Sequence, residues 1–241
     1  MERNQYIEEL FKVFEANGLA ALLNKESANK LYDFSCNLIE RNKQFNLTAI
    51  TDEREIIIKH FVDCASIAPL ISDGAKVIDV GCGAGFPSIP LAILRKDLQI
   101  TALDSTQKRI NFVNEQAGIL NLENISGVCA RAEEYSITNR ESFDVCTSRA
   151  VARLNILTEL CIPCVKIGGS FIAMKSIKGE EELSEAESGI GKLGGHLDLK
   201  QADTFTYKEI TTQRTLFVIK KERQTPKEFP RKFAQITKKP L

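Results

Sequence analysis

One segment of the chain reads Lys76-Val77-Ile78-Asp79-Val80-Gly81-Cys82-Gly83-Ala84-Gly85-Phe86-Pro87. Its β-branched run predicts a buried parallel strand, and the three glycines after it allow a sharp turn before a helix that begins near Pro87. Because glycine has no Cβ, such a loop lets backbone approach a bound molecule closely. The segment therefore predicts a strand, a tight loop and a helix N-terminus that together hold a nucleotide-like cofactor.

The spacing of these glycines narrows the choice of cofactor. Dinucleotide-binding loops carry the pattern G-x-G-x-x-G, whereas Gly81, Gly83 and Gly85 form G-x-G-x-G and Phe86 takes the sixth position. A pyrophosphate needs an open helix N-terminus with free N–H groups, and a bulky Phe followed by Pro87 removes part of that cradle. S-adenosylmethionine carries no phosphate, so it is the cofactor that this pattern favours.

Composition bounds the class of protein. The chain has 241 residues, of which 43% are hydrophobic and 27% charged, and this suits one globular domain of generous size or one domain with a small appendage. The formal net charge is zero, so any nucleic-acid site must come from locally concentrated charge. No apolar run approaches the roughly 18 residues of a membrane span, and the N-terminus does not resemble a signal peptide. We therefore expect a cytoplasmic protein with no membrane contact.

The cysteines and histidines argue against a metal site. The seven cysteines are scattered, which favours reduced core thiols over a disulfide framework. Cys161 and Cys164 form a single C-x-x-C inside a predicted helix, and His60 and His196 are the only histidines. Because a zinc site normally needs four such ligands at characteristic spacings, we expect no metal.

The pattern of elements predicts three parts: a helical cap (1–72), an α/β domain (73–220) and a basic tail (221–241). Apolar spacing predicts helices over about 5–23, 27–42 and 52–70 in the cap. In the α/β domain, strands and helices alternate. The strands are expected at 75–80, 99–104, 124–129, 143–148, 168–175, about 197–205 and 213–220, and the helices at about 87–95, 106–120, 152–166 and 179–192.

Such alternation predicts a mostly parallel sheet with helices on both faces. The last two strands are joined by a short loop, 206–212, with no room for a crossover helix, so they should form an antiparallel hairpin at the edge. A seven-stranded sheet that ends in such a hairpin resembles the class I methyltransferase fold, an α/β architecture that uses S-adenosylmethionine.

Polar residues follow the second and third predicted strands, where this fold class binds ligands. Asp104, with Ser105 and Thr106, ends the second strand and is placed to accept hydrogen bonds from ribose hydroxyls; the alternative is that these residues only cap the next helix. Ala132 and Glu133 follow the third strand and are candidates for adenine contact. The alternative for this segment is a solvated acidic turn.

Two cations follow the fourth and fifth strands. Arg149, in Ser148-Arg149-Ala150, should lie near the reacting centre, where its fork of donors can hold a carboxylate or a base oxygen. Lys175 is a second positioning candidate, which contacts RNA phosphate or is an ordinary strand-end cation. No Asn/Asp-Pro-Pro-aromatic motif follows the fourth strand, so exocyclic amines are unsuitable substrates. Cys164 lies too far into the next helix to be the nucleophile that carbon-5 methylation needs.

Cations and amides outside these strand ends are candidates for RNA contact. They comprise Arg41, Lys43 and Asn46 in a polar loop, Lys59 and His60 in the third predicted helix, and Arg231 and Lys232 in the tail. His60 and Asp63 lie one turn apart and form either a general base with its partner or, more commonly, a structural pair. The basic tail is either a solvated end or a surface that positions phosphates.

These motifs together resemble one family. Asn46-Leu47-Thr48-Ala49-Ile50, Lys59-His60-Phe61-Val62-Asp63, Gly85-Phe86-Pro87-Ser88-Ile89-Pro90-Leu91, Leu103-Asp104-Ser105, Lys108-Arg109, Arg131-Ala132-Glu133-Glu134, Ser148-Arg149-Ala150 and the basic end of the chain are similar to those of the RsmG (GidB) family. That family methylates N7 of a guanine in 16S rRNA of the small ribosomal subunit.

The resemblance implies roles for particular residues. Gly81, Phe86, Ala132, Glu133 and Arg149 would bind S-adenosylmethionine, with Asp104, Ser105 and Thr106 on its ribose side. We expect a monomer whose substrate is 16S rRNA or the small subunit. Two alternatives remain at this point, a small-molecule methyltransferase of the same fold and a non-catalytic RNA-binding assembly factor.

The chemistry of guanine N7 sets what the site must supply. The N7 lone pair is available in the neutral base, so attack on the sulfonium methyl needs no general base, and catalysis would come mostly from positioning and a prearranged charge environment. An Arg bidentate to O6 and N7 would block the reacting lone pair. Arg149 should therefore contact the cofactor or O6 alone.

Overall fold

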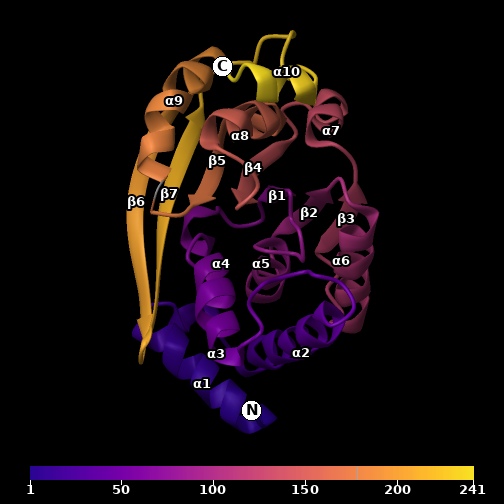
Figure 1. Cartoon of the computed structure of the whole chain (residues 1–241), viewed down its shortest axis with the longest axis vertical. Coiled ribbons are helices and arrows are strands. Elements are labelled where there is room, and N and C mark those ends of the chain that lie inside the picture. Colours follow the sequence, from indigo (N-terminus) through magenta and orange to yellow (C-terminus); the bar gives the residue numbers. More distant parts are fainter. Residues whose placement is uncertain (178) are drawn as a thin grey trace.

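The structure is a computed structural model that describes residues 1–177 and 179–241 (Figure 1). Its strands are β1 (Lys76–Val80), β2 (Gln99–Asp104), β3 (Ile125–Cys129), β4 (Phe143–Arg149), β5 (Val165–Lys175), β6 (Gly195–Tyr207) and β7 (Ile210–Lys221). Its α-helices are α1 (Arg3–Ala16), α2 (Lys25–Asn42), α3 (Glu53–Ile56), α4 (Asp63–Ala65), α5 (Ser88–Leu94), α6 (Gln107–Ile119), α7 (Ala132–Thr138), α8 (Leu154–Cys161), α9 (Gly179–Lys192) and α10 (Phe233–Lys238). Short 3-10 turns lie at Ala20–Leu22, Ala68–Leu70 and Ile162–Cys164.

The strands form one seven-stranded sheet in the order β3-β2-β1-β4-β5-β7-β6. The first five strands run parallel, and β7 is antiparallel both to β5 and to β6. The predicted fold class is thereby confirmed, including the antiparallel hairpin at the edge. Because the order reverses between β1 and β4, the carboxyl ends of these strands flank a crevice where α/β folds bind ligands.

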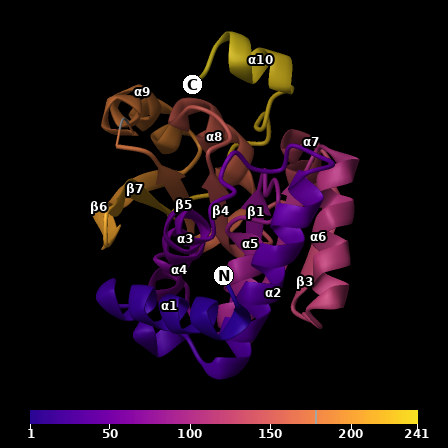
Figure 2. The ribbon, with the colours of Figure 1, turned by 60° about the horizontal axis from the view of Figure 1, so that its bottom comes forward.

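A hydrophobic core lies on each face of the sheet, between the strands and the helices that flank them in Figure 2. Alternate residues of one strand serve both, since Val77 packs in the core beneath α2, α5 and α6 whereas Ile78 packs beneath α8 and α9. Both residues are fully buried. Burial on both faces explains why the apolar residues of β1, Val77, Ile78 and Val80, do not alternate with exposed polar ones.

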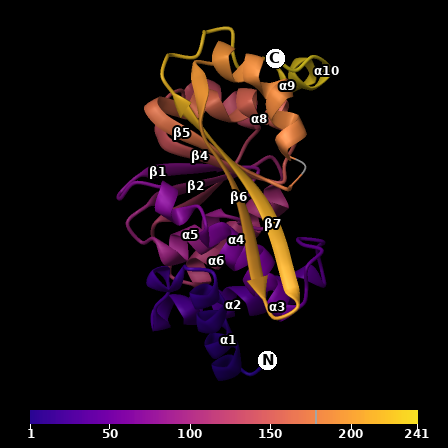
Figure 3. The ribbon, with the colours of Figure 1, turned by 90° about the vertical axis from the view of Figure 1, so that its left-hand side faces the viewer.

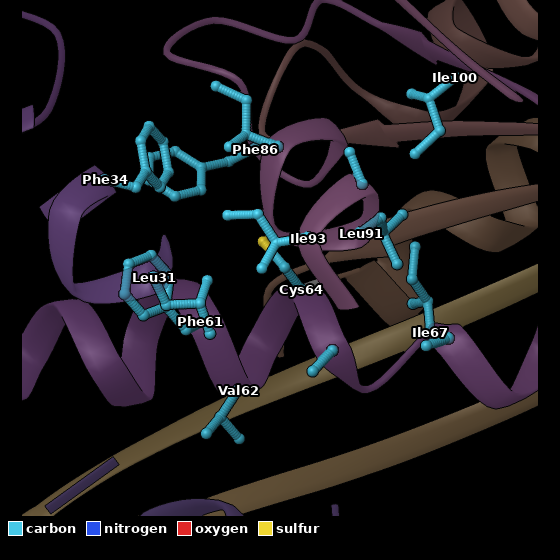
Figure 4. Packing of buried hydrophobic residues seen from close by; sticks show 14 of the residues in the cluster. Leu31, Phe34, Phe61, Val62, Cys64, Ile67, Phe86, Leu91, Ile93 and Ile100 are labelled. Carbon is cyan, nitrogen blue, oxygen red and sulfur yellow. The ribbon is translucent and has the colours of Figure 1, made fainter. Parts of the chain in front are cut away.

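The N-terminal helices belong to the first of these cores. Phe34 of α2 stacks on Phe61 with ring centroids 6.0 Å apart and lies 5.4 Å from Phe86 of the glycine loop. Figure 4 shows Phe34 beside Phe86, with Phe61 and Leu31 next to each other below them and Ile93 of α5 to their right. The packing therefore joins the helical cap directly to the loop that precedes α5.

The long helix expected over 52–70 is interrupted. Between α3 and α4 the backbone forms a π-helical segment, η2 (Ile57–Val62), and a 3-10 turn follows at Ala68–Leu70. Single π turns inside helices often occur at functional sites. Periodicity alone did not reveal the interruption, because the apolar residues on either side keep nearly helical spacing.

The hairpin β6–β7 is longer than predicted and extends past the sheet to the N-terminal helices (Figure 3). Lys208 in its turn donates to Glu9 of α1 at 2.6 Å, and the Thr206 N–H donates to Asn17 at 3.1 Å. Arg54 also donates to Glu9, at 2.9 Å. The hairpin thus fastens the helical cap to the α/β domain.

The tail after residue 221 packs back on the molecule. Arg231 forms a bidentate pair with the fully buried carboxylate of Glu159 in α8, at 2.9 and 2.6 Å, and Ile236 of α10 is fully buried. Arg140 donates to the carbonyls of Pro226 and Phe229 at 2.7 and 2.6 Å. Neither α10 nor α7 was predicted, because both are short and mostly polar. Within residues 1–177 and 179–241, no helix is long and apolar enough to cross a membrane.

Candidate functional site

A cavity of about 460 Å³ lies at the carboxyl ends of β1, β2 and β4. Most of the residues expected to bind a cofactor line it, namely Gly81, Gly83, Phe86, Asp104, Ser105, Ala132, Glu133 and Arg149. Gly85 and Thr106 do not line it. Gly85 has a φ of +89°, and a Cβ there would lie 2.4 Å from Ile89, so this glycine is needed for packing at the start of α5. Thr106 is the N-cap residue of α6.

Asp104 joins the glycine loop to the second strand. It is 5% exposed, and its Oδ2 accepts from the Gly83 N–H at 3.1 Å and from Arg109 at 3.2 Å. Its Oδ1 accepts from the Thr106 N–H at 2.8 Å. Asp104 therefore orders the turn before α6, as the capping interpretation expects, and it also lines the cavity where a ribose would bind.

Ala132 and Glu133 begin a helix, α7, rather than an acidic turn. Glu133 is 8% exposed and accepts from Arg131 Nε at 3.2 Å. A carboxylate near a helix N-terminus is favoured by the positive end of the helix dipole. Glu133 is a buried acceptor in the cavity wall.

The facing wall is built around His60, Phe86 and Arg149. The His60 ring stacks on Phe86, with centroids 4.3 Å apart, and the Arg149 guanidinium lies over the same ring at 5.0 Å. His60 Nε2 lies 3.0 Å from Thr48 Oγ1, and His60 Nδ1 lies 3.2 Å from Arg149 Nη2. Arg149 thus lines the cavity, and its contact with a cofactor or with guanine O6 stays a prediction.

A buried carboxylate behind this wall holds two arginines. Asp63 is fully buried and accepts from Arg149 Nη1 at 2.8 Å, and from Arg214 of β7 through Nε at 2.6 Å and Nη2 at 2.7 Å. Arg149 Nη1 also donates to the Lys59 carbonyl in η2 at 3.2 Å. The general-base pair considered for His60 and Asp63 is therefore not formed, because Asp63 binds the two guanidinium groups instead.

The pKa values of two buried side chains in this region are shifted in opposite directions. Burial, together with the nearby Arg149 charge, lowers the pKa of His60 from 6.5 to about 3, so its imidazole is neutral at physiological pH. Asp79 in β1 is fully buried, and burial raises its pKa from 3.8 to about 7. Asp79 Oδ2 accepts from the Ser88 N–H at 3.2 Å, while its Oδ1 has no partner among the described residues.

The cations proposed for RNA contact fall into two groups. Lys175 is 8% exposed, donates to the Ala152 carbonyl at 2.7 Å and pairs with Glu182 at 2.8 Å, so the expectation of a phosphate contact there is corrected to a buried structural cation. The Arg231 guanidinium is likewise held in an ion pair with Glu159.

The remaining candidates lie at or near the surface, except His60, which lies in the cavity wall. Lys43, Asn46 and Lys232 are exposed, and Lys43 pairs with Glu40 at 2.6 Å. Arg41 pairs with Glu115, and Lys59 pairs with Glu55 at 2.5 Å. These exposed pairs can be exchanged for phosphate contacts at little cost, because a surface ion pair contributes only about 0–1 kcal/mol.

Several residues of the site were not singled out from the sequence. Asp79 could have been found, because a carboxylate inside an apolar strand is unusual. Arg109 and Arg131 occur within the motifs but had no assigned role. Phe233, one of two phenylalanines in the basic tail, and Arg214, in an alternating polar strand, carry no signal that connects them with the cavity. Among the described residues, no cluster of His, Cys, Asp or Glu could hold a metal ion.

Comparison with known proteins adds to this geometry. A family model described as rRNA small subunit methyltransferase G (GidB) matches residues 27–205. The chain is 46% identical over 224 residues to the ribosomal RNA small subunit methyltransferase G of Staphylococcus aureus strain bovine RF122 / ET3-1, covering 91% of this chain and 92% of that protein. It is 49% identical over 209 residues to the protein of the same name from Staphylococcus aureus strain Newman, covering 85% and 86%.

Solved structures share the fold at low sequence identity. A putative transferase from Pyrococcus horikoshii has a TM-score of 0.55 at 15% identity, covering 67% of this chain and 64% of that one. TYW2 from M. jannaschii in complex with AdoMet has a TM-score of 0.54 at 15% identity, covering 66% and 74%. The cyclase SpnF has a TM-score of 0.56 at 12% identity, covering 80% and 94%. Because one of these proteins is named as a cyclase, the fold by itself does not establish the reaction.

Proposed function

Because the chain belongs to the rRNA small subunit methyltransferase G family, we propose that it transfers the methyl group of S-adenosylmethionine to N7 of a guanine in 16S rRNA. The observation that carries this proposal is the cavity in which the glycine loop, Asp104 and Glu133 meet opposite Arg149. The substrate is 16S rRNA or the small ribosomal subunit. We expect the protein to act as a monomer in the cytoplasm.

The residues of the cavity fit this cofactor. Gly81 has a φ of +76°, and a Cβ added there would lie 2.4 Å from a methyl group of Val151. Glycine is therefore the residue that fits this position. Asp104 can accept from the ribose hydroxyls, and Glu133 can accept from the adenosine part. When bound, S-adenosylmethionine supplies an electrophilic methyl group on a sulfonium.

The surroundings of His60 suit a reaction that needs no proton transfer. An imidazole whose pKa lies at about 3 is neutral at the pH of the cell, and its Nδ1 and Nε2 already face Arg149 and Thr48. It is therefore a packing partner of Phe86 rather than a general base. This agrees with guanine N7, whose lone pair is available in the neutral base.

Arg149 contributes position and charge. Arg149 Nη1 donates to Asp63 and to the Lys59 carbonyl, and Nη2 lies against His60, so the fork formed by the two Nη groups is held within the protein rather than free to grip O6 and N7. The reacting lone pair is thus left open. We propose that Arg149 holds the cavity wall and contributes to its prearranged charge environment, the kind of effect on which this chemistry depends.

The test is incorporation of labelled methyl from S-adenosylmethionine into small ribosomal subunits and, separately, into free rRNA, followed by mapping of the modified base. Label at a guanine N7 is expected, and the preferred acceptor shows when in assembly the protein acts. Cofactor binding without label in either RNA would favour a small-molecule methyltransferase. Absence of cofactor binding would favour a non-catalytic RNA-binding factor.

A further inference from the structure

Phe233 brings the C-terminal tail into the cavity, at the end formed by Ala130, Arg131, Ala132 and Glu133. We propose that Phe233 is a base-stacking residue that binds the adenine of the cofactor. This proposal rests on the proposed function, and it adds to the cofactor site a residue from outside the segment 27–205 that the family model matches. The ligand chemistry is that of a purine, which has a π face that an aromatic ring can stack on.

The Phe233 side chain is not used in the hydrophobic core. It is 37% exposed, whereas Ile236 of the same helix is fully buried. The Arg131 guanidinium lies 4.6 Å from the centre of the Phe233 ring, and Arg131 Nε donates to Glu133 at 3.2 Å. One chain of contacts thus joins Phe233 to a residue already proposed to bind adenosine.

The backbone that carries Phe233 is firmly anchored. Glu159, two helical residues from the end of α8, is fully buried and accepts both from the Arg231 guanidinium and from the Arg231 backbone N–H at 2.8 Å. Its neighbour Leu160 lines the same cavity as Phe233. Since Arg231 is only two residues before Phe233, the ion pair fixes the ring relative to the cavity wall, and little ordering entropy is lost when a ligand binds.

A fluorescent reporter tests the placement. The chain contains four tyrosines but no tryptophan, so Phe233→Trp introduces a single tryptophan, whose emission is separated from that of tyrosine by selective excitation. Titration with S-adenosylhomocysteine is expected to quench this emission, because a stacked purine contacts the indole directly. The matched control is Phe45→Trp, since Phe45 is 40% exposed but lines a different cavity of about 180 Å³. Emission from Trp at this control position should stay unchanged.

Affinity measurements test the energetic role. Phe233→Ala should weaken binding of S-adenosylhomocysteine about 5- to 30-fold by calorimetry, within the range found when a base loses an aromatic partner. Phe233→Tyr should keep nearly full affinity, and Phe45→Ala should change nothing. The same factor is expected for 5′-methylthioadenosine, which has the adenine but lacks the amino-acid part. Thermal unfolding of Phe233→Ala should match that of the unaltered protein, because the ring is outside the core.

The outcomes separate this inference from the function it rests on. If the unaltered protein binds S-adenosylhomocysteine but Phe233→Ala binds it equally well and the Phe233→Trp emission does not respond, the inference is wrong and the proposed function stands. A loss of affinity for S-adenosylhomocysteine that is absent with 5′-methylthioadenosine would also overturn the adenine assignment. If the unaltered protein binds neither compound, both the proposed function and the inference fail.

Discussion

The two walls of the cavity differ in how the chain builds them. The wall that carries Asp104 is assembled from strand ends that follow one another along the chain, from Gly81 to Glu133. The wall that carries Arg149, together with the Asp63 cluster behind it, joins segments from Thr48 to Arg214. Asp104 has one charged partner, Arg109, whose side chain is 49% exposed. Asp63 has two, Arg149 and Arg214, whose side chains are 11% and 14% exposed.

This difference separates ligand binding from stability. A partner that lies next to water, as Arg109 does, contributes little to stability, because water replaces the contact when it is lost. Removing one member of a buried ionic cluster leaves an uncompensated charge and costs about 3–5 kcal/mol. We therefore expect changes in the Asp104 wall to act mainly on cofactor affinity, and changes in the Asp63 cluster to act mainly on folding.

The largest effect is expected from Asp63→Asn. This change keeps the shape of the side chain but leaves two buried guanidinium groups without their carboxylate, so the free energy of unfolding should fall by about 3–5 kcal/mol. Denaturant unfolding measures it. The matched control is Glu55→Gln, which removes the exposed partner of Lys59 and should cost at most about 1 kcal/mol. Equal losses in the two variants would show that the buried cluster has no special weight.

Asp104→Ala should act on the other wall. It removes the acceptor proposed for the ribose hydroxyls, and S-adenosylmethionine binding should weaken about 10- to 100-fold, as expected for hydrogen bonds to a charged group. Asp104→Asn, which keeps one carbonyl oxygen, should fall between this variant and the unaltered protein. Unfolding should change less than in Asp63→Asn. Unchanged affinity in Asp104→Ala would contradict the assignment.

Two buried groups near the cavity, His60 in its wall and Asp79 in β1, should make stability depend on pH in opposite directions. The low pKa of His60 means that the unfolded chain binds more protons than the folded one between pH 3 and 6.5, so this group raises the free energy of unfolding as pH rises. The raised pKa of Asp79 means that the folded chain binds more protons between pH 3.8 and about 7, so this group lowers the free energy of unfolding as pH rises. Each effect amounts to about 2 kcal/mol between pH 5 and 7.

Replacing either side chain should reveal how the other one makes the free energy of unfolding depend on pH. His60→Gln should make the free energy of unfolding fall more steeply with pH than in the unaltered protein, and Asp79→Asn should make it rise. Denaturant unfolding at pH 5, 6 and 7 measures both slopes relative to the unaltered chain. If both variants keep its pH profile, the buried groups do not titrate as inferred.

The smallest effect on stability is expected from replacing two glycines of one loop. Gly83→Ala places a Cβ in open space at a φ of +58°, and the left-handed backbone should cost about 1 kcal/mol. Gly85→Ala adds a collision with Ile89 at the start of α5 and should cost about 1 kcal/mol more. Thermal unfolding checks the order. A reversed order would mean that the loop shifts to relieve the contact with Ile89.

The parts of the fold that were predicted correctly depend on short-range patterns. The alternation of apolar runs and helical segments between residues 76 and 221 indicates a parallel sheet, and the short turn around Lys208 indicates an antiparallel hairpin. Periodicity did not reveal η2 or the full length of the hairpin. Those depend on contacts with α1 and with Arg149, which are distant in the sequence.

The cations illustrate the same limit. A basic tail predicts either solvation or RNA contact, because composition does not state which carboxylate lies nearby. Arg231 instead binds Glu159, 72 positions earlier, and Lys175 binds Glu182 across the start of α9. Each pair has one buried member, Glu159 in the first and Lys175 in the second, and burial is a property of the packed chain.

The sequence by itself determined the strand, glycine loop and helix at residues 76–94 and the acidic residue that ends β2, because each depends on the conformational limits of a few neighbouring residues. The tertiary structure alone decided that Asp63 binds Arg149 and Arg214 rather than His60, and that Phe233 reaches the cavity from the end of the chain. Those contacts join residues more than 80 positions apart, and only the packing of the two hydrophobic cores brings them within hydrogen-bonding or van der Waals distance.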